Sequence, residues 1–309
     1  MHYVTRPRTL VTVLVLAVLA VLVVLVIPGG DNEKQGQASM IGLAEEIGRF
    51  VGGLRDDAQY RPPDQDERDR LTAVVDRLSR VAGAAPVADP GPSLSELGYT
   101  YRIGTDERTG RPIAVLDQQP GSDRAWGMYV VDLSTPAKLV VEVPHPVADM
   151  DTEKVGLALF QQAPGSVLAI SGTHRRVADG AGDVAHRADS MFHAVVTALG
   201  ATGLPQVQLH GFDNASLSGK DVVLSPGAGA AGPGFRQAAE DLADRGLRVC
   251  RAWRDQCGAL EGTRNEQGVE AAAHGVPFAH VEMNRTVRSE ESHWRAVVEV
   301  LAKVDFRAE

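Results

Sequence analysis

The sequence predicts an α/β fold whose sheet is mixed and mainly parallel. The first observation is that short apolar runs rich in β-branched residues alternate with longer runs of helical spacing, as in strand–helix units. The second is size and composition. The chain has 309 residues, 44% of them hydrophobic, which suffices for a packed core and allows two domains at most.

Composition also excludes several classes of protein. The formal net charge is −9, from 31 Lys+Arg against 40 Asp+Glu, whereas a nucleic-acid binder would carry a basic face. Two cysteines exclude a disulfide-rich scaffold and a zinc site built on thiolates alone. We therefore expect an acidic globular protein that does not bind nucleic acid.

The N-terminus carries the signature of a membrane segment. Leu10–Ile27 is apolar apart from Thr12 and follows Arg6 and Arg8. This length reaches the ~18 apolar residues of a transmembrane helix, whereas the cores of signal peptides usually have ~7–15. We expect 1–30 to be an uncleaved, single-pass signal anchor, with the rest of the chain extracytoplasmic by the positive-inside rule. The alternative is a cleaved signal peptide, which gives the same location.

A juxtamembrane region is expected next, over 31–92. Apolar residues at helical spacing predict helices within Met40–Leu54 and Arg70–Val81. Ala84–Pro92 is rich in proline, alanine and glycine and is typical of a linker. We therefore expect a separate catalytic α/β domain over 93–309.

The strands and helices of this α/β region follow from the alternation. The predicted strands are Tyr99–Ile103, Ile113–Leu116, Met128–Val131, Leu139–Val143, Val167–Ser171, Val207–His210, Val222–Ser225, Leu247–Cys250 and Phe278–Glu282. The predicted helices are Asp151–Ala163, Ala185–Leu199, Phe235–Arg245, Asn265–Ala273 and Ser289–Val304. We expect the first three strands to be antiparallel and the later ones largely parallel.

Polar residues gather where four of these strands end. His145 follows the strand Leu139–Val143, and His174 follows the fifth predicted strand. His210 and Glu282 stand at the ends of two later strands. Sites in open α/β sheets form outside the carboxyl ends of the strands, so we expect these side chains to converge at one edge.

Two imidazoles and a carboxylate can hold Zn²⁺ with one position open, as catalytic zinc sites do. His145, Asp149 and His210 would supply that set. Asp151 and Glu153 remain rival carboxylate ligands. Zinc lowers the pKa of bound water to about 7 and polarises a carbonyl group.

Glu282 is the candidate catalytic residue, since a carboxylate beside the metal can take the proton of the water and pass it to a leaving amine. Paired N–H groups of arginine can hold a substrate carboxylate. The candidate substrate-binding residues are His174, Arg175, Arg285 and Arg288.

Other histidines are assigned lesser roles. His186 and His193 lie seven apart on one helical face, which favours a solvated polar stripe over a face that borders the site. His274, His280 and His293 are interpreted as structural or surface residues.

The order of these residues is similar to that of the zinc carboxypeptidase-like superfamily, and within it to N-formylglutamate amidohydrolases and poly-γ-glutamate hydrolases. The resemblance covers roughly Leu139–Val304, and Val281–Arg288 resembles the strand of the latter family with its catalytic glutamate and trailing arginines. It implies a three-layer α/β/α fold, one zinc ion, and a metallopeptidase-like hydrolase that cleaves an amide bond next to a carboxylate in a small acidic amide or peptide. By motif, His145 and His210 match the metal histidines and Glu282 the catalytic glutamate.

The chain departs from the family pattern at two places. The nearest acid, Asp149, stands four positions after His145, whereas the carboxypeptidase pattern has a glutamate three positions after the histidine. Pro146-Val147 replaces the two glycines that follow the first histidine in poly-γ-glutamate hydrolases. These departures leave the carboxylate ligand and the substrate open.

Cys250 and Cys257 are the only cysteines of the chain. In an oxidising compartment a disulfide between them is expected. It would order the loop that leads to Asn265, near the predicted site.

Two alternative functions stay open. Gly227–Gly232 fits the pattern G-x-G-x-x-G between a predicted strand and a predicted helix, which is the context of a dinucleotide fingerprint. A non-catalytic envelope protein of the same fold that only binds a ligand is the other alternative. The zinc content of the purified protein distinguishes it from the enzyme.

Overall fold

The computed structural model describes residues 1–2, 39–83, 89–118 and 123–306. The predicted anchor, Leu10–Ile27, lies outside these residues. Within the described ranges, no helix has the length and hydrophobicity needed to cross a membrane. The elements below all belong to the compact unit that begins at Ala38.

The described residues of this unit form a mixed sheet of ten strands, in the order β1-β2-β3-β4-β6-β5-β7-β10-β8-β9. The strands are β1 Met40–Ile41, β2 Tyr99–Asp106, β3 Pro112–Gln118, β4 Met128–Asp132, β5 Leu139–Val143, β6 Ser166–Ile170, β7 Gln206–Phe212, β8 Val222–Ser225, β9 Val249–Arg251 and β10 Phe278–Asn284. The central strands β6, β5, β7 and β10 run parallel to one another. β2, β3 and β4 form the expected antiparallel entry, and β8 is antiparallel to β10.

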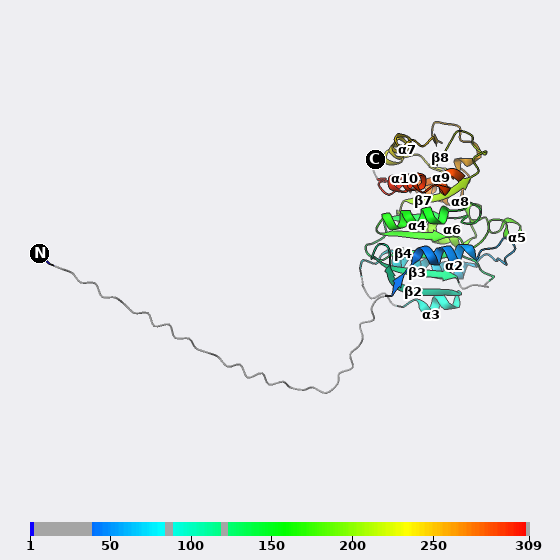
Figure 1. Cartoon of the computed structure of the whole chain (residues 1–309). Helices are drawn as coiled ribbons and strands as arrows, with labels where there is room; N and C mark the ends of the chain where they lie inside the picture. The colour runs from blue at the N-terminus through cyan, green and yellow to red at the C-terminus, as the bar shows by residue number, and fades with distance from the viewer. Residues whose placement is uncertain (3–38, 84–88, 119–122, 307–309) are drawn as a thin grey trace. The chain divides into compact units, whose positions relative to one another are not determined.

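Helices cover both faces of the sheet (Figure 1). They are α1 Leu43–Gly52, α2 Gln65–Ser79, α3 Gly91–Glu96, α4 Thr152–Gln162, α5 Val177–Gly180, α6 Met191–Ala201, α7 Pro233–Asp244, α8 Glu266–Ala273, α9 Arg285–Ser289 and α10 Glu291–Leu301, with short 3₁₀ turns at Val184–His186 and Gly258–Glu261. α1, α4, α7 and α10 share one apolar core with the sheet, and α2 and α6 share the other, with α8 beside α6. The predicted three-layer α/β class is therefore confirmed.

The two helices predicted in the juxtamembrane region are present as α1 and α2. α2 begins at a capping box, in which Asp64 accepts from the Glu67 N–H at 2.9 Å and Glu67 accepts from the Asp64 N–H at 3.0 Å. Leu71 and Val75 of α2 are completely buried in the core. Both helices thus pack on the sheet, within the same compact unit as the α/β region.

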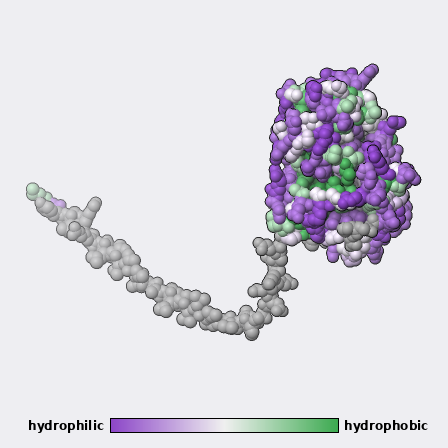
Figure 2. Space-filling model, turned by 45° about the vertical axis from the view of Figure 1, so that its right-hand side comes forward, coloured by the Kyte–Doolittle hydropathy of each residue, from purple (hydrophilic) through white to green (hydrophobic). Residues whose placement is uncertain are grey.

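Several element boundaries differ from the prediction, and at two helices the difference has a clear local cause. The predicted helix Ala185–Leu199 begins with a 3₁₀ turn, and α6 starts only at Met191, where Ser190 caps it by accepting the His193 N–H. The predicted helix Ser289–Val304 is α10, which a break at Glu290 separates from α9. The surface of the folded part is largely hydrophilic on the face shown in Figure 2, with a hydrophobic patch near its middle.

Candidate metal centre

The parallel strands bring the predicted site residues to one edge of the sheet. His145 lies just beyond β5, and the register of β7 and β10 sets His210 directly opposite Glu282. His280 is two residues before Glu282 and therefore points to the same face. All four side chains are buried, so the cluster that they form lies in the interior of the protein.

Asp149 lies between the two predicted metal histidines. Its Oδ2 atom is 3.5 Å from Nδ1 of His145 and 3.2 Å from Nδ1 of His210. The spacing of four residues follows from a tight turn, in which the Asp149 N–H donates to the His145 carbonyl at 2.8 Å. Burial opposes ionisation of Asp149, but its contacts with the two imidazoles hold its pKa well below the ordinary value.

Asp183 orients His145 from the loop after β6. Its Oδ1 atom is 2.8 Å from Nε2 of His145, and its Oδ2 accepts from Arg175 at 2.9 Å. In the neutral form of His145 that donates Nε2–H to Asp183, the lone pair is on Nδ1 and faces Asp149. A carboxylate behind a ligating histidine is the usual outer support of a metal site. His186 also contacts Asp183, at 3.2 Å, and its side chain is exposed to solvent.

His280 is a member of this cluster, and its interpretation as a structural or surface residue was incomplete. Its ring centroid is 4.5 Å from that of His210. His210, His280 and Glu282 offer ligand atoms within 4.8 Å of one another, as do His145, Asp149 and His210. The strand period of two, applied to His280 and Glu282, was the signal that could have found it.

Gly262 makes room for the His280 ring. A Cβ atom at this position would lie 2.6 Å from the ring, and the backbone has φ +62°, a conformation that glycine adopts without strain. Burial holds the pKa of His280 well below its ordinary value, and the nearby His210 lowers it further. His280 is therefore a neutral imidazole at physiological pH.

The structure distinguishes Asp149 from its rivals. Asp151 pairs with Lys154 and, at 2.5 Å, with Arg285. Glu153 is on α4 and lines a separate cavity of about 500 Å³ together with Trp294. Of these three acids, Asp149 is the one that lies beside the imidazoles.

The arginines predicted to bind substrate have different surroundings. Arg288 is buried and donates to the carbonyls of Met283 at 3.0 Å, Met150 at 2.6 Å and Phe212 at 3.1 Å. Through these bonds Arg288 connects separate segments of the backbone. Arg285 is held by Asp151 as described above. Arg175 is partly exposed and pairs with Asp183, which also contacts His145. Of the three predicted substrate-binding arginines, it is the one linked to the histidine cluster.

His174 precedes Arg175 in the loop after β6. It is partly buried, and its Nδ1 accepts the Arg176 N–H at 3.2 Å. His174 therefore stabilises this turn through its imidazole. It is the neighbour in sequence of Arg175, which is predicted to bind substrate.

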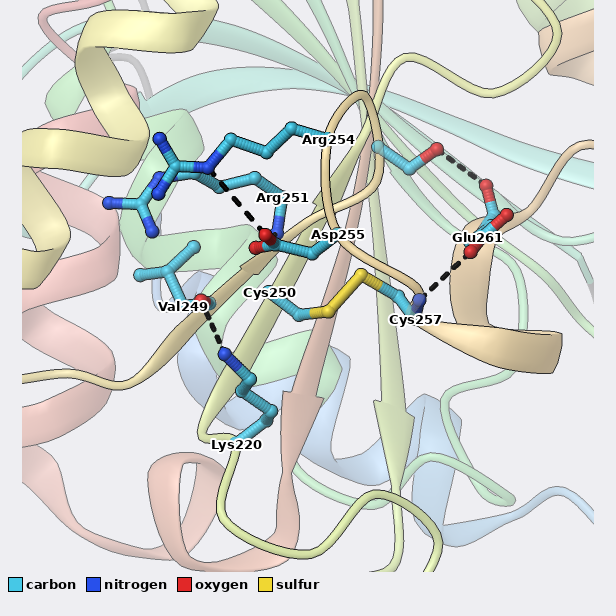
Figure 3. Close-up of a disulfide and its surroundings, with 9 residues drawn as sticks. Lys220, Val249, Cys250, Arg251, Arg254, Asp255, Cys257 and Glu261 are labelled. Carbon is cyan, nitrogen blue, oxygen red and sulfur yellow. Dashed lines mark hydrogen bonds and ion pairs between the residues drawn. A yellow bond between two sulfur atoms is a disulfide. The ribbon is translucent and has the colours of Figure 1, made fainter.

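The predicted disulfide between Cys250 and Cys257 is present (Figure 3). Glu261 anchors the loop that follows, since its side chain accepts the Cys257 N–H at 2.9 Å and its carbonyl accepts the Ser225 hydroxyl at 2.5 Å. The loop leads directly to Gly262, against which His280 packs. The disulfide therefore supports a wall of the candidate site.

The glycine-rich segment Gly227–Gly232 lies away from this site. It follows β8, which is antiparallel to β10, so it stands at the opposite edge of the sheet. A Cβ at Gly227 would contact the ring of Phe278, at the start of β10, at 3.1 Å. Gly227 thus packs closely on Phe278, and the segment does not border the histidine cluster.

Comparisons with known proteins place the fold in context. No family model and no curated protein matches the sequence. Among solved structures, the chain is similar to zinc-free YndL, with 11% identity, a TM-score of 0.40, and coverage of 59% of this chain and 90% of that one. A candidate carboxypeptidase A from Shewanella denitrificans OS-217 has 15% identity and a TM-score of 0.38, with 69% of this chain and 65% of that one covered.

A candidate metallopeptidase from Shewanella amazonensis SB2B has 12% identity and a TM-score of 0.34, with 68% of this chain and 88% of that one covered.

Glu142 is a buried acid of β5 behind the cluster, and it has no exposed surface. Its Oε2 accepts from Nε2 of Gln208 at 2.7 Å. Burial raises its pKa to about 8, and the bond from Gln208 offsets only part of that shift. The folded protein therefore keeps a proton that the unfolded chain has released between about pH 4.5 and pH 8.

A loss of stability with rising pH follows from this difference in proton binding. We expect Glu142→Gln to raise the free energy of unfolding relative to the wild type, by roughly 3–5 kcal/mol at pH 8 and by little at pH 4. Urea unfolding across this range measures the difference. Parallel pH profiles for the two proteins would contradict the assignment.

Proposed function

We propose that the chain is a zinc-dependent amidohydrolase, anchored in the membrane, with an extracytoplasmic catalytic domain. The observation that carries the proposal is the pair of Nδ1 atoms, from His145 and His210, that face the same carboxylate oxygen of Asp149. Two neutral imidazoles and one carboxylate form a donor set that suits zinc and leaves a position open for water.

Unpaired polar atoms support a metal ion at these residues. In the described part of the chain, the buried atoms without a hydrogen-bond partner include Nδ1 of His145, Nδ1 of His280 and Oε2 of Glu282. Buried polar atoms are rarely left unpaired in folded proteins. Their grouping around His210 is what a cation and its water would satisfy.

Zinc and Glu282 have different roles in the proposed hydrolysis. When bound, zinc would acidify a water molecule and polarise the substrate carbonyl. Glu282 takes the proton of the attacking water and delivers it to the leaving nitrogen. Burial raises its pKa well above the ordinary value, and the charge of Asp149 adds to the shift. The positive charge of a bound zinc ion would favour the ionised form of Glu282, which is the form that accepts the proton.

The substrate class is an amide or peptide with a carboxylate next to the scissile bond. Arg175 supports this, since its partly exposed guanidinium lies beside Asp183 at the histidine cluster. A screen of zinc-loaded protein against N-acyl amino acids and γ-glutamyl peptides tests it, each paired with the analogue in which the carboxylate is amidated. Turnover of the acids alone is expected. Zinc binding without turnover of any amide would favour the non-catalytic binding protein.

The location is supported by the segment Leu10–Ile27 and by the disulfide, which is typical of oxidising compartments. Fractionation of cells that express the full chain is expected to leave protein of full mass in the membrane pellet. A shortened product in the soluble fraction would overturn the anchor.

A further inference from the structure

A buried polar cluster lies behind His210, on the side of its ring opposite Nδ1. Gln208 is two residues earlier in β7 and faces the same side of the sheet. Its Oε1 atom is 2.6 Å from Nε2 of His210 and 2.5 Å from Nδ2 of Asn265. Its Nε2 donates to Glu142 and, at 3.1 Å, to Oε1 of Gln267. None of these side chains lies at the protein surface.

Backbone groups at both ends of the cluster fix the direction of its hydrogen bonds. Asn265 accepts the Gly268 N–H at 3.0 Å through Oδ1, so its amide nitrogen must face Gln208. Gln267 donates from Nε2 to the Val184 carbonyl at 2.9 Å, so its oxygen must face Gln208. A backbone N–H can only donate and a carbonyl can only accept, and neither amide can therefore be reversed.

The orientation of Gln208 follows from its two neighbours. Its nitrogen must point to the oxygen of Gln267, and its oxygen must point to the nitrogen of Asn265. The oxygen that faces His210 is thus an acceptor and cannot donate. His210 must therefore carry a proton on Nε2, and in its neutral form, the form that binds a metal ion, the lone pair is on Nδ1.

We propose that Gln208, held by Asn265 and Gln267, is the positioning residue of the metal centre. It fixes both the tautomer and the ring direction of His210, so that Nδ1 presents its lone pair toward Asp149. The inference rests on the proposed zinc site. It assigns His210 a neutral amide partner where His145 has the carboxylate of Asp183.

Removal of Gln208 is expected to weaken zinc binding because partners behind a ligating histidine typically contribute 10–100-fold in metal affinity. Gln208→Met keeps the length of the side chain but removes the acceptor for His210. Gln206→Met is the matched control, since Gln206 is also in β7, is also buried, and donates to the Val196 carbonyl at 3.1 Å without contact to the histidines.

Competition with a chromophoric zinc chelator measures the affinities of the wild type and both variants. We expect Gln208→Met to bind zinc about 10–100-fold more weakly, and Gln206→Met to match the wild type within about twofold. Equal affinities for all three proteins would overturn the inference while leaving the zinc site in place.

The tautomer is read independently from ¹H–¹⁵N correlation spectra of the histidine rings in the metal-free wild type. A proton on Nε2 of His210 is expected, and a neutral ring with its proton on Nδ1 alone would overturn the inference. This measurement needs neither bound metal nor a folded variant. Failure of the wild type to bind zinc would therefore refute the proposed function, and the spectrum would still decide the role of Gln208.

Discussion

Glu282→Gln is expected to keep its zinc and to lose hydrolysis by about 10²–10⁴-fold, the usual contribution of a general acid–base group. Glutamine preserves the shape of the side chain but cannot accept the proton of the water. Turnover of a substrate found in the screen and zinc content by mass spectrometry are measured on the same sample.

Glu153→Gln is the control for this variant. Glu153 is also a buried glutamate whose pKa is raised by burial, but it lines a different cavity. It is expected to retain wild-type turnover. Full activity of Glu282→Gln, or loss of activity in both variants, would show that the proton is carried elsewhere.

The second large effect concerns the carboxylate ligand. Asp149→Asn is expected to weaken zinc binding by at least about 100-fold, more than the loss of an outer partner, because it removes the charge that both imidazoles face. Asp151→Asn and Glu153→Gln are expected to bind zinc as the wild type does, since Asp151 pairs with Lys154 and Arg285.

Chelator competition on the three variants separates the rival ligands. Loss of affinity in Asp151→Asn with no loss in Asp149→Asn would reverse the assignment. Circular dichroism of each variant checks that the fold is retained, so that a change in affinity reports on the ligand itself.

Local patterns were sufficient to predict most of the fold. The runs Leu139–Val143 and Val222–Ser225 match β5 and β8 at both ends, because each is a β-branched segment buried on both faces. The strand-end rule correctly brought His145, His210 and Glu282 to one edge. The disulfide followed from the number of cysteines alone.

The remaining features depend on contacts between distant parts of the chain. Asp183 reaches His145 from a loop 38 residues away, and no local motif marks it. The partners of Arg288 could not be predicted from the sequence either. An arginine after a strand can face a substrate or, as here, donate to backbone carbonyls. His280 was missed because a lone buried histidine is more often structural.

Zinc content of the purified wild-type protein tests the central claim most directly, with His210→Ala beside it. After exposure to zinc and removal of the excess, the wild type is expected to hold about one ion per chain, as a site with three protein ligands does, and His210→Ala is expected to hold almost none. A wild-type protein without zinc, or a variant that retains the same amount, would contradict the metal centre.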